Sequence, residues 1–365
     1  MFATQNIEVI FLPFLVAFIA TSLITPFAIR LSKKIGLLDD PAVHKHPGVI
    51  HKKPIPRGGG IPMFFGAILS GILFLPINPT TVAIFFASFL ALIIGVIDDR
   101  LNAVSKDVSP YIRFFINILC AVIVVGSGVT IPFITHPFGG ILHLDSFSFS
   151  LFGLDAISLG DIIAIIWIIW VMNMLNWSKG VDGQMPGIVT ISAIIIGLLS
   201  LRLSPNNHDA LIDGTLSFII AGCSAGFLLY NFFPARIFPG YGATSIYLLL
   251  AVVSILSSAK LATAILVMGI PTVDAGFTIV RRILAGRSPF WHDNKHLHHL
   301  LLRIGYSQRQ VALFYWLISA ILGTISLTLQ SKSKVFAIIM LVTIVAGGLL
   351  FLHFVVKYTH EKVTS

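Results

Sequence analysis

Long apolar runs recur along almost the whole chain, and they limit its fold more than any other feature. A helix that crosses a membrane needs about 20 mostly apolar residues, because the hydrocarbon core of a bilayer is about 30 Å thick. Runs close to that length lie at about 7–29, 59–76, 81–97, 112–131, 159–175, 187–201, 214–233, 243–258, 261–280, 310–329 and 335–356. The sequence therefore predicts an all-α integral membrane protein with about eleven transmembrane helices, folded as a single polytopic domain over residues 1–365.

The composition supports a membrane location and excludes several other classes. Apolar residues make up 56% of the chain and charged residues only 11%, whereas about 25% of an ordinary globular protein is charged. A chain with so few charges cannot cover a soluble fold, and it is too apolar to stay disordered in water. Its two cysteines, Cys120 and Cys223, lie inside apolar runs, so they fit a helix core and not a disulfide framework.

The positions of the basic residues predict which loops face the cytoplasm. Loops that follow odd-numbered runs, together with the C-terminal tail, hold 20 of the 24 Lys and Arg residues. Because basic residues concentrate in cytoplasmic loops, we expect a cell (cytoplasmic) membrane protein with its N-terminus outside and its C-terminus in the cytoplasm. The cytoplasmic loops are then about 30–58, 98–111, 176–186, 234–242 and 281–309. Topology thus accounts for most of the net charge of +9, and a nucleic-acid partner has little support.

The unusual polar residues gather in or beside these same loops. They are Lys53 and Arg57 in the first loop, Asp98 and Asp99 after the third run, Asn173, Asn176, Lys179 and Asp182 around the end of the fifth, Asn231 at the end of the seventh, and His296, His298 and His299 in the last large loop. Paired carboxylates suit a hard cation such as Mg²⁺, while histidine and basic side chains donate hydrogen bonds to phosphate oxygens. Asn173 and Asn176 share one helix face and can read a base or a sugar. We therefore expect an active site for phosphoryl chemistry at the cytoplasmic face.

Each motif also has a structural interpretation. Asp98 and Asp99 beside Arg100 are typical of a solvated helix end with a local ion pair. The HLHH segment resembles a zinc site, but it lacks the Glu and the histidine spacing of a metalloprotease helix. The glycine run at 58–60 favours close helix packing or a turn, and Asp274 fits a structural carboxylate at a helix break as well as a catalytic one. Their convergence on one membrane face is what indicates a site.

Several segments together resemble a known enzyme family. They are GLLDDP and PIPRGGGIPMFFG in the first loop, GVIDDR after the third run, NMLN and GVDG around the fifth, GFLLYNFFPARIFPG after the seventh, PTVDAGFTIVRR in the ninth and KHLHHLLLRIG in the last loop. Over about residues 30 to 305 the chain is similar to the polyprenyl-phosphate N-acetylhexosamine-1-phosphate transferases of glycosyltransferase family 4. The resemblance implies transfer of a sugar-1-phosphate from a UDP-sugar to a polyprenyl phosphate, such as undecaprenyl phosphate, with release of UMP. Such a step starts a lipid-linked cell-envelope glycan.

The resemblance also implies roles for individual residues. Asp98 and Asp99 match the family's acidic pair, of which one deprotonates the lipid phosphate or holds it near Mg²⁺. Asp182 matches the second acid of an N-x-x-D-G-x-D-G motif, and Asn231 matches an Asn of the nucleotide site. The histidine loop at 296–299 matches a loop near the diphosphate and favours UDP-GlcNAc-like donors over a peptide-bearing one.

Two positions depart from the family pattern. Lys179 stands where the first Asp of that motif is expected, and Tyr241 stands where an Asp on Mg²⁺ is expected in the segment F-x-G-D-x-G-S. Replacing Asp by Lys adds two units of charge and replacing Asp by Tyr adds one, so the site is about three units more positive than the pattern. We therefore expect Mg²⁺ to be less needed and less well held.

Three outcomes follow from these departures. Lys179 contacts the diphosphate and partly replaces Mg²⁺, or Asp98, Asp99 and Asp182 hold the metal in altered geometry. Alternatively, the chain has lost catalysis and binds the lipid carrier or nucleotide sugar as a scaffold or regulator. We rank retained transfer first, because the acidic pair, Asp182 and the histidine loop remain. A transporter ranks last, because the polar residues gather at one surface. The sugar and the oligomeric state stay open, and a homodimer is one option.

Overall fold

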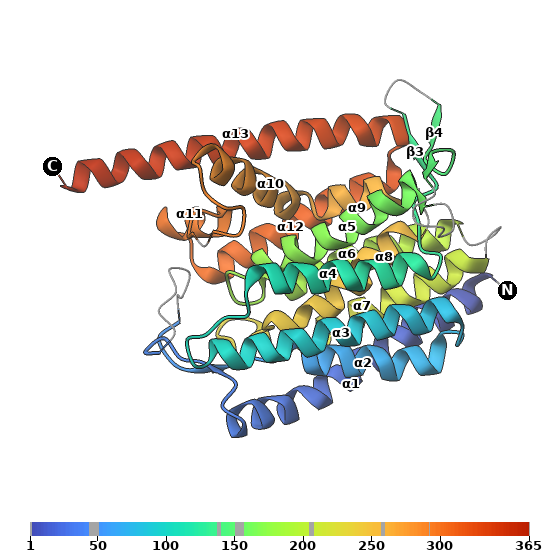
Figure 1. The fold of residues 1–365 in the computed structure, drawn as a ribbon, viewed down its shortest axis with the longest axis horizontal. Helices are drawn as coiled ribbons and strands as arrows, with labels where there is room; N and C mark the ends of the chain where they lie inside the picture. The colour runs from blue at the N-terminus through green and yellow to red at the C-terminus, as the bar shows by residue number, and fades with distance from the viewer. Residues whose placement is uncertain are drawn as a thin grey trace.

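A bundle of helices that run side by side makes up most of the molecule (Figure 1). The computed structural model describes residues 2–43, 51–136, 140–149, 157–203, 208–256, 260–291 and 293–364. In these ranges the remaining regular structure is three short antiparallel strand pairs, which lie at the ends of the bundle. The prediction of a mainly helical membrane protein is therefore confirmed.

The elements have the following bounds. The helices are α1 (Phe2–Lys34), α2 (Gly60–Phe74), α3 (Pro79–Asn102), α4 (Pro110–Gly126), α5 (Leu159–Trp177), α6 (Gln184–Leu203), α7 (His208–Asn231), α8 (Thr244–Ile255), α9 (Leu261–Val267), α10 (Gly269–Leu284), α11 (Leu297–Arg303), α12 (Gln308–Thr328) and α13 (Ser331–Thr364), with a 3-10 turn, η2 (Tyr241–Ala243), before α8. The strand pairs are β1 (Leu38–Asp39) with β2 (Ile55–Pro56), β3 (Phe133–Thr135) with β4 (Ile141–His143), and β5 (Ser148–Phe149) with β6 (Ile157–Ser158).

Each predicted apolar run falls on a helix or on a pair of helices. In the described chain, seven helices are long and apolar enough to cross a membrane: α1, α3, α5, α6, α7, α12 and α13. The bent pair α9–α10 makes an eighth candidate, and the other runs coincide with the shorter apolar helices α2, α4 and η2 with α8. The chain is thus a multi-pass membrane protein, while the count of about eleven crossings stays a prediction.

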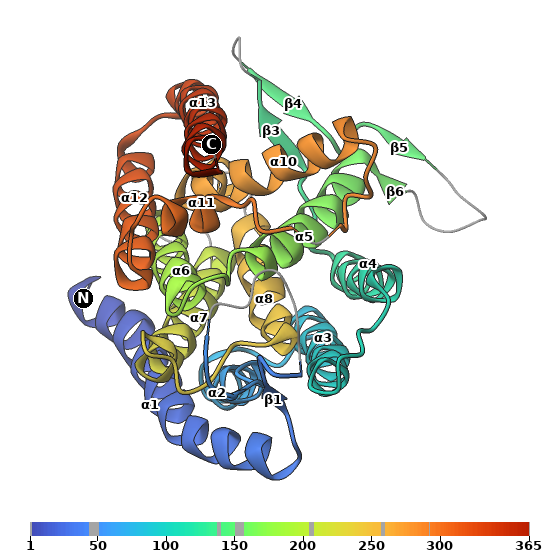
Figure 2. The same cartoon turned by 90° about the vertical axis from the view of Figure 1, so that its left-hand side faces the viewer.

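The ninth predicted span, 261–280, is not one straight helix, which corrects the sequence-based expectation. Helix α9 ends at Val267, α10 begins at Gly269, and the two axes differ by 82°. Pro271 explains the break, because it has no backbone N–H and its ring clashes with the carbonyl group of Val267, four residues earlier. Helix α10 therefore leaves the common direction of its neighbours (Figure 2).

Helix α8 lies at the centre of the bundle, inside a ring of other helices (Figure 2), and all of its residues are buried. Glycines allow the turn before it to approach α2 and α3. A Cβ atom on Gly60 would lie 2.2 Å from the carbonyl carbon of Gly242, and one on Gly95 would lie 2.3 Å from the Gly242 Cα atom. The glycine run at 58–60 is therefore a packing feature, as its composition favours.

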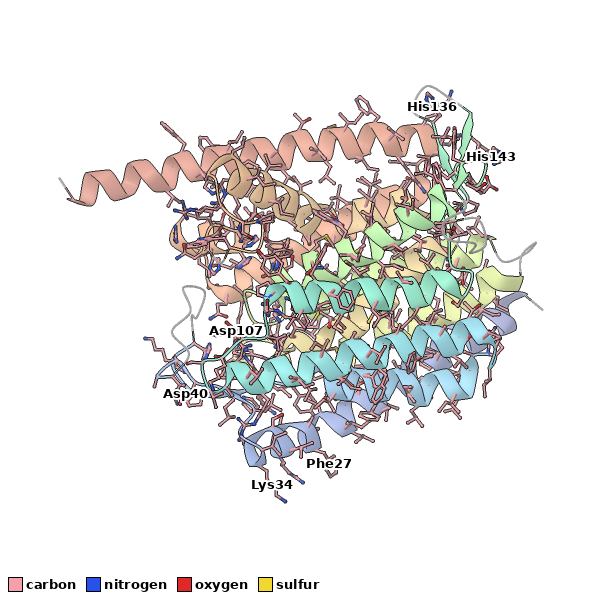
Figure 3. The ribbon with its side chains drawn as sticks, in the orientation of Figure 1. Phe27, Lys34, Asp40, Asp107, His136 and His143 are labelled. Atoms are coloured by element: carbon pink, nitrogen blue, oxygen red, sulfur yellow. The ribbon has the colours of Figure 1, made fainter. Side chains whose placement is uncertain are left out.

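The loops that the sequence assigns to one membrane face meet at one end of the bundle. Figure 3 places Lys34, Asp40 and Asp107 at that end, and His136 and His143 at the opposite end. The first residues of α1 and the last residues of α13 also lie at opposite ends (Figure 1). This arrangement agrees with the predicted sidedness, and the orientation in a membrane stays a prediction.

Candidate active site

A cavity of about 300 Å³ opens where the predicted cytoplasmic loops meet. Most of the predicted site residues line it: Arg57, Asp98, Asp99, Asn173, Asn176, Lys179, Asp182, Tyr241, His296, His298 and His299. They come from α3, α5, η2, α11 and the loops between helices, so residues far apart in the sequence share one space. Lys53 and Asn231 are the predicted residues that do not line the cavity.

The acidic pair lies in the last turn of α3, inside the protein and not in a loop. Only 3% of Asp98 and 1% of Asp99 is exposed, so the alternative of a solvated helix end is wrong. The Asp98 carboxylate forms an ion pair with Arg113 at 3.2 Å. The Asp99 carboxylate accepts a hydrogen bond from the backbone N–H of Tyr241 at 2.9 Å, and Arg57 lies 4.0 Å away. Both acids are therefore held by cations or N–H groups of the chain itself.

The β1–β2 hairpin positions Arg57 at the cavity. Pairing of Asp39 with Ile55 in the hairpin brings Asp39 close to Arg57, and their side chains form an ion pair at 2.6 Å. Arg57 thus bridges Asp39 and Asp99 across the cavity wall. Lys53 precedes this hairpin strand, but it is exposed to solvent and lies outside the lining.

Lys179 projects into the cavity from the loop between α5 and α6. Its Nζ atom donates a hydrogen bond of 2.9 Å to the carbonyl oxygen of Gly240. Burial lowers the pKa of Lys179 to about 8, although the negative charge of Asp99 opposes that shift. The ammonium group therefore lies beside the acidic pair, in the electrostatic field of Asp99.

The backbone of Tyr241 contacts the carboxylate of Asp99. While its N–H donates to Asp99, its ring is flanked by two cations: the Arg113 guanidinium at 5.1 Å and the Lys179 Nζ atom at 5.8 Å from the ring centroid. The phenol oxygen accepts a hydrogen bond from Asn117 at 3.3 Å. The Tyr241 backbone thus contacts Asp99, while the Lys179 ammonium lies by the Tyr241 ring and the neighbouring Gly240 carbonyl.

Asp182 and Asn231 connect the loops below the cavity. The Asp182 carboxylate accepts a hydrogen bond from the backbone N–H of Ala235 at 2.9 Å, and burial raises the pKa of Asp182. The Asn231 amide accepts from the N–H of Gly183 at 3.1 Å and donates to the carbonyl of Ile237 at 2.8 Å. Asn231 therefore ties the loop after α5 to the loop after α7, beneath the cavity lining.

The histidine loop is fixed by a carboxylate on the bent helix. Asp274 of α10 lies 2.9 Å from the His296 Nδ1 atom, and its other oxygen accepts from the N–H of Leu297 at 3.0 Å. The His298 ring stacks on His296 and contacts His299. Burial lowers the pKa of His298 well below its usual value and that of His299 to about 4, so both rings are neutral at neutral pH. Asp274, left open by the sequence, thus orients His296.

Several lining residues were not predicted: Asp39, His51, Asn102, Asp107, Arg113, Trp177, Arg282 and Asp293. The sequence could have indicated Arg113, because this residue lies in the first turn of α4. The helix dipole disfavours a cation there, so a nearby acid is expected. Arg282 has no such signal in the sequence, because its ion pair with Asp293 at 3.0 Å and its position over the Trp177 ring depend on the tertiary fold.

The residues around the acidic pair do not fit a magnesium site. Mg²⁺ takes near-octahedral oxygen ligands, usually one or two of them carboxylates. Here Asp98, Asp99 and Asp182 already accept hydrogen bonds from N–H groups of the chain. Two positive side chains, Arg113 and Lys179, also lie against or near this pair. Within the described ranges, no three His, Cys, Asp or Glu side chains lie close enough to share a metal ion.

The fold and the cavity define a multi-pass membrane protein with a cavity of acidic, basic and histidine side chains at one end of the bundle. The chain belongs to glycosyl transferase family 4, whose model matches residues 81–258. It is 30% identical over 304 residues, 73% of this chain and 70% of the relative, to a decaprenyl-phosphate N-acetylglucosaminephosphotransferase of Mycobacterium tuberculosis.

Two further relatives match over more of the chain. A probable undecaprenyl-phosphate N-acetylglucosaminyl 1-phosphate transferase of Bacillus subtilis is 28% identical, over 88% of this chain and 85% of the relative. An undecaprenyl-phosphate alpha-N-acetylglucosaminyl 1-phosphate transferase of Escherichia coli O157:H7 is 27% identical, over 92% of this chain and 88% of the relative. The similarity therefore extends over nearly the whole bundle and not only over the part that the family model matches.

Proposed function

We propose that this protein is a phosphoglycosyl transferase that moves N-acetylhexosamine-1-phosphate from a UDP-sugar to a polyprenyl phosphate and releases UMP. One observation carries the proposal: acids, fixed cations and histidines from distant segments line one cavity at the polar end of an apolar bundle. A water-soluble nucleotide sugar and the phosphate of a membrane lipid can meet at such a place. The names of the relatives, which specify undecaprenyl or decaprenyl phosphate, support the lipid acceptor.

The reaction requires one bond to form and one to break. An oxygen of the lipid phosphate attacks the phosphorus that carries the sugar, and the bond from that phosphorus to the bridging oxygen of UMP breaks. Negative charge spreads over the phosphoryl oxygens in the transition state, so catalysis depends on positioning and on fixed positive charge. Lys179, Arg57 and Arg113 supply that charge, and a hydrogen bond to Gly240 holds Lys179 in place.

The other lining residues have further roles in the proposed reaction. One acid of the pair, Asp98 or Asp99, takes the proton from the lipid phosphate when that phosphate is protonated. Asn173 and Asn176 on α5 contact the sugar or the base, and His296, held by Asp274, donates to the diphosphate. In this proposal the protein lies in the cell membrane with the predicted sidedness, so the site faces the cytoplasm, where nucleotide sugars are found.

A second candidate function rests on the two replaced acids. With Lys179 and Tyr241 at the positions where the family has Asp, the protein binds the lipid carrier or the nucleotide sugar but does not turn it over. Such a protein acts as a scaffold or regulator in the membrane. The two functions differ in one measurable quantity, the formation of a lipid-linked sugar.

The deciding experiment supplies purified protein in detergent with undecaprenyl phosphate and radiolabelled UDP-GlcNAc. Labelled lipid and UMP are expected in equal amounts. Asp99→Asn should lower the rate by about 100-fold or more, because the cavity loses one carboxylate of the pair that accepts the proton. Lys34→Met, which removes an exposed lysine at the end of α1, should match the wild type. No labelled lipid with any of several UDP-sugars, with nucleotide-sugar binding intact, would instead establish the binding function.

A further inference from the structure

We infer that the ammonium group of Lys179 is the resident cation of the cavity and replaces a divalent metal ion, so that transfer proceeds without one. The inference adds to the proposed function, and its activity test depends on the proposed transfer reaction. It concerns residues in which this chain departs from its family, and it identifies the charge that neutralises the diphosphate.

The first observation is that Lys179 and Asp99 both contact Gly240. The Lys179 Nζ atom donates to the Gly240 carbonyl at 2.9 Å, while the Asp99 carboxylate packs against the Gly240 Cα atom. A Cβ atom at Gly240 would lie only 2.0 Å from an Asp99 oxygen. The ammonium therefore stands next to the acidic pair, where a cation is expected to sit, and a hydrogen bond fixes it there.

The second observation is that the residue in place of the other acid also disfavours a metal. Tyr241 offers no carboxylate, and its backbone N–H occupies an oxygen of Asp99. Its ring lies between Arg113 and Lys179. A divalent ion at Asp99 would therefore compete with a hydrogen bond already formed and would lie close to fixed positive charges.

The third observation is that Lys179 retains donor capacity for a ligand. An ammonium group has three N–H donors. Among the described residues, the structure shows one of them used, on the Gly240 carbonyl. Because Lys179 also lines the cavity, the remaining donors can reach diphosphate oxygens. A point charge with free donors is what a phosphate-binding lysine supplies.

The activity test compares two arms, Mg²⁺ and EDTA, in the lipid-product assay. We expect the same rate of labelled lipid formation in both arms for the wild type. We expect Lys179→Met, which keeps a long unbranched side chain and removes the charge, to lower the rate by about 100-fold in both arms. Product that forms only with Mg²⁺, or full activity of Lys179→Met, would overturn the inference.

A binding test does not depend on turnover. Mn²⁺ is titrated into the protein, and its free concentration is followed by electron paramagnetic resonance. The wild type and Lys34→Met should leave Mn²⁺ free, whereas the double variant Lys179→Asp with Tyr241→Asp, which restores both acids, should bind about one ion per chain. Stoichiometric binding by the wild type would overturn the inference.

The two tests separate the failure of the inference from the failure of the proposed function. If no UDP-sugar gives product in either arm, the transfer reaction fails, but the Mn²⁺ titration still decides whether Lys179 has replaced the metal. If that double variant is not recovered as a folded protein by size-exclusion chromatography, the double variant Lys179→Met with Tyr241→Asp takes its place. Mn²⁺ binding by that variant and not by the wild type supports the inference, and equal binding by both contradicts it.

Discussion

For single residues, the sequence-based expectation is a site that differs from the family pattern by the charge of two side chains. The sequence shows both differences, at Lys179 and Tyr241, and predicts a site about three units more positive than the family pattern. It does not show that Lys179 binds Gly240 or that Tyr241 binds Asp99, because these contacts join residues 61 and 142 positions apart. Only the folded chain reveals that the lysine takes a fixed position beside the acid.

The pKa of Lys179 leads to a prediction about pH. Burial lowers this pKa to about 8, so the ammonium is charged below that pH and becomes neutral as the pH rises through it. The rate of transfer should therefore fall as the pH rises from about 7 to about 9, because Lys179 loses the positive charge that neutralises phosphate. The initial rate of lipid product formation, measured across this range with saturating substrates, tests the prediction. Lys179→Arg, whose guanidinium stays charged, serves as the control and should remove the fall; a wild-type rate that is level to pH 10 would contradict it.

At the scale of elements, glycines set how closely the loops approach the acidic pair. Gly240 has a φ of +67°, in the left-handed region that favours glycine, and it leaves no room for a side chain beside Asp99. The bent pair α9–α10 acts at the same scale, because the break at Pro271 directs Asp274 toward His296. The sequence predicts these helices, but the angle between them depends on tertiary packing.

Gly240→Ala should lower stability and activity far more than Gly286→Ala, although both glycines have the same φ. Gly286 also has a φ of +67° but has open space around it, so Gly286→Ala should cost only the conformational strain, about 1–2 kcal/mol. Gly240→Ala adds a collision with the Asp99 carboxylate, which must move. Thermal unfolding in detergent and the lipid-product assay measure both variants. Equal loss of stability and activity in the two would mean that the contact with Asp99 does not matter.

At the scale of the whole molecule, the apolar helices and the basic loops together define two different ends. The end with the cavity holds Lys34, Asp40 and Asp107, and the other end holds the β3–β4 hairpin. The predicted sidedness places the first end in the cytoplasm, because 20 of the 24 Lys and Arg residues lie in those loops and the C-terminal tail.

Cysteine labelling tests this orientation. His143→Cys on β4 should react with a membrane-impermeant maleimide in intact cells, whereas Lys34→Cys at the end of α1 should react only after permeabilisation. The background should be low, because the native Cys120 and Cys223 are both buried. The opposite pattern, with Lys34→Cys labelled in intact cells, would invert the assigned topology.

Local sequence patterns are enough to establish the class of the protein and the chemistry available to it. Apolar runs of membrane-spanning length dictate a helical membrane fold, since the bilayer leaves backbone groups no other partner. The motifs around Asp98 and Lys179 predict several of the residues that line the cavity. How these residues are used depends on the folded chain: Lys179 is fixed on Gly240, Arg113 pairs with Asp98, and Asn231 bridges two loops. These contacts join distant segments, so they depend on packing and backbone geometry, which local sequence patterns do not encode.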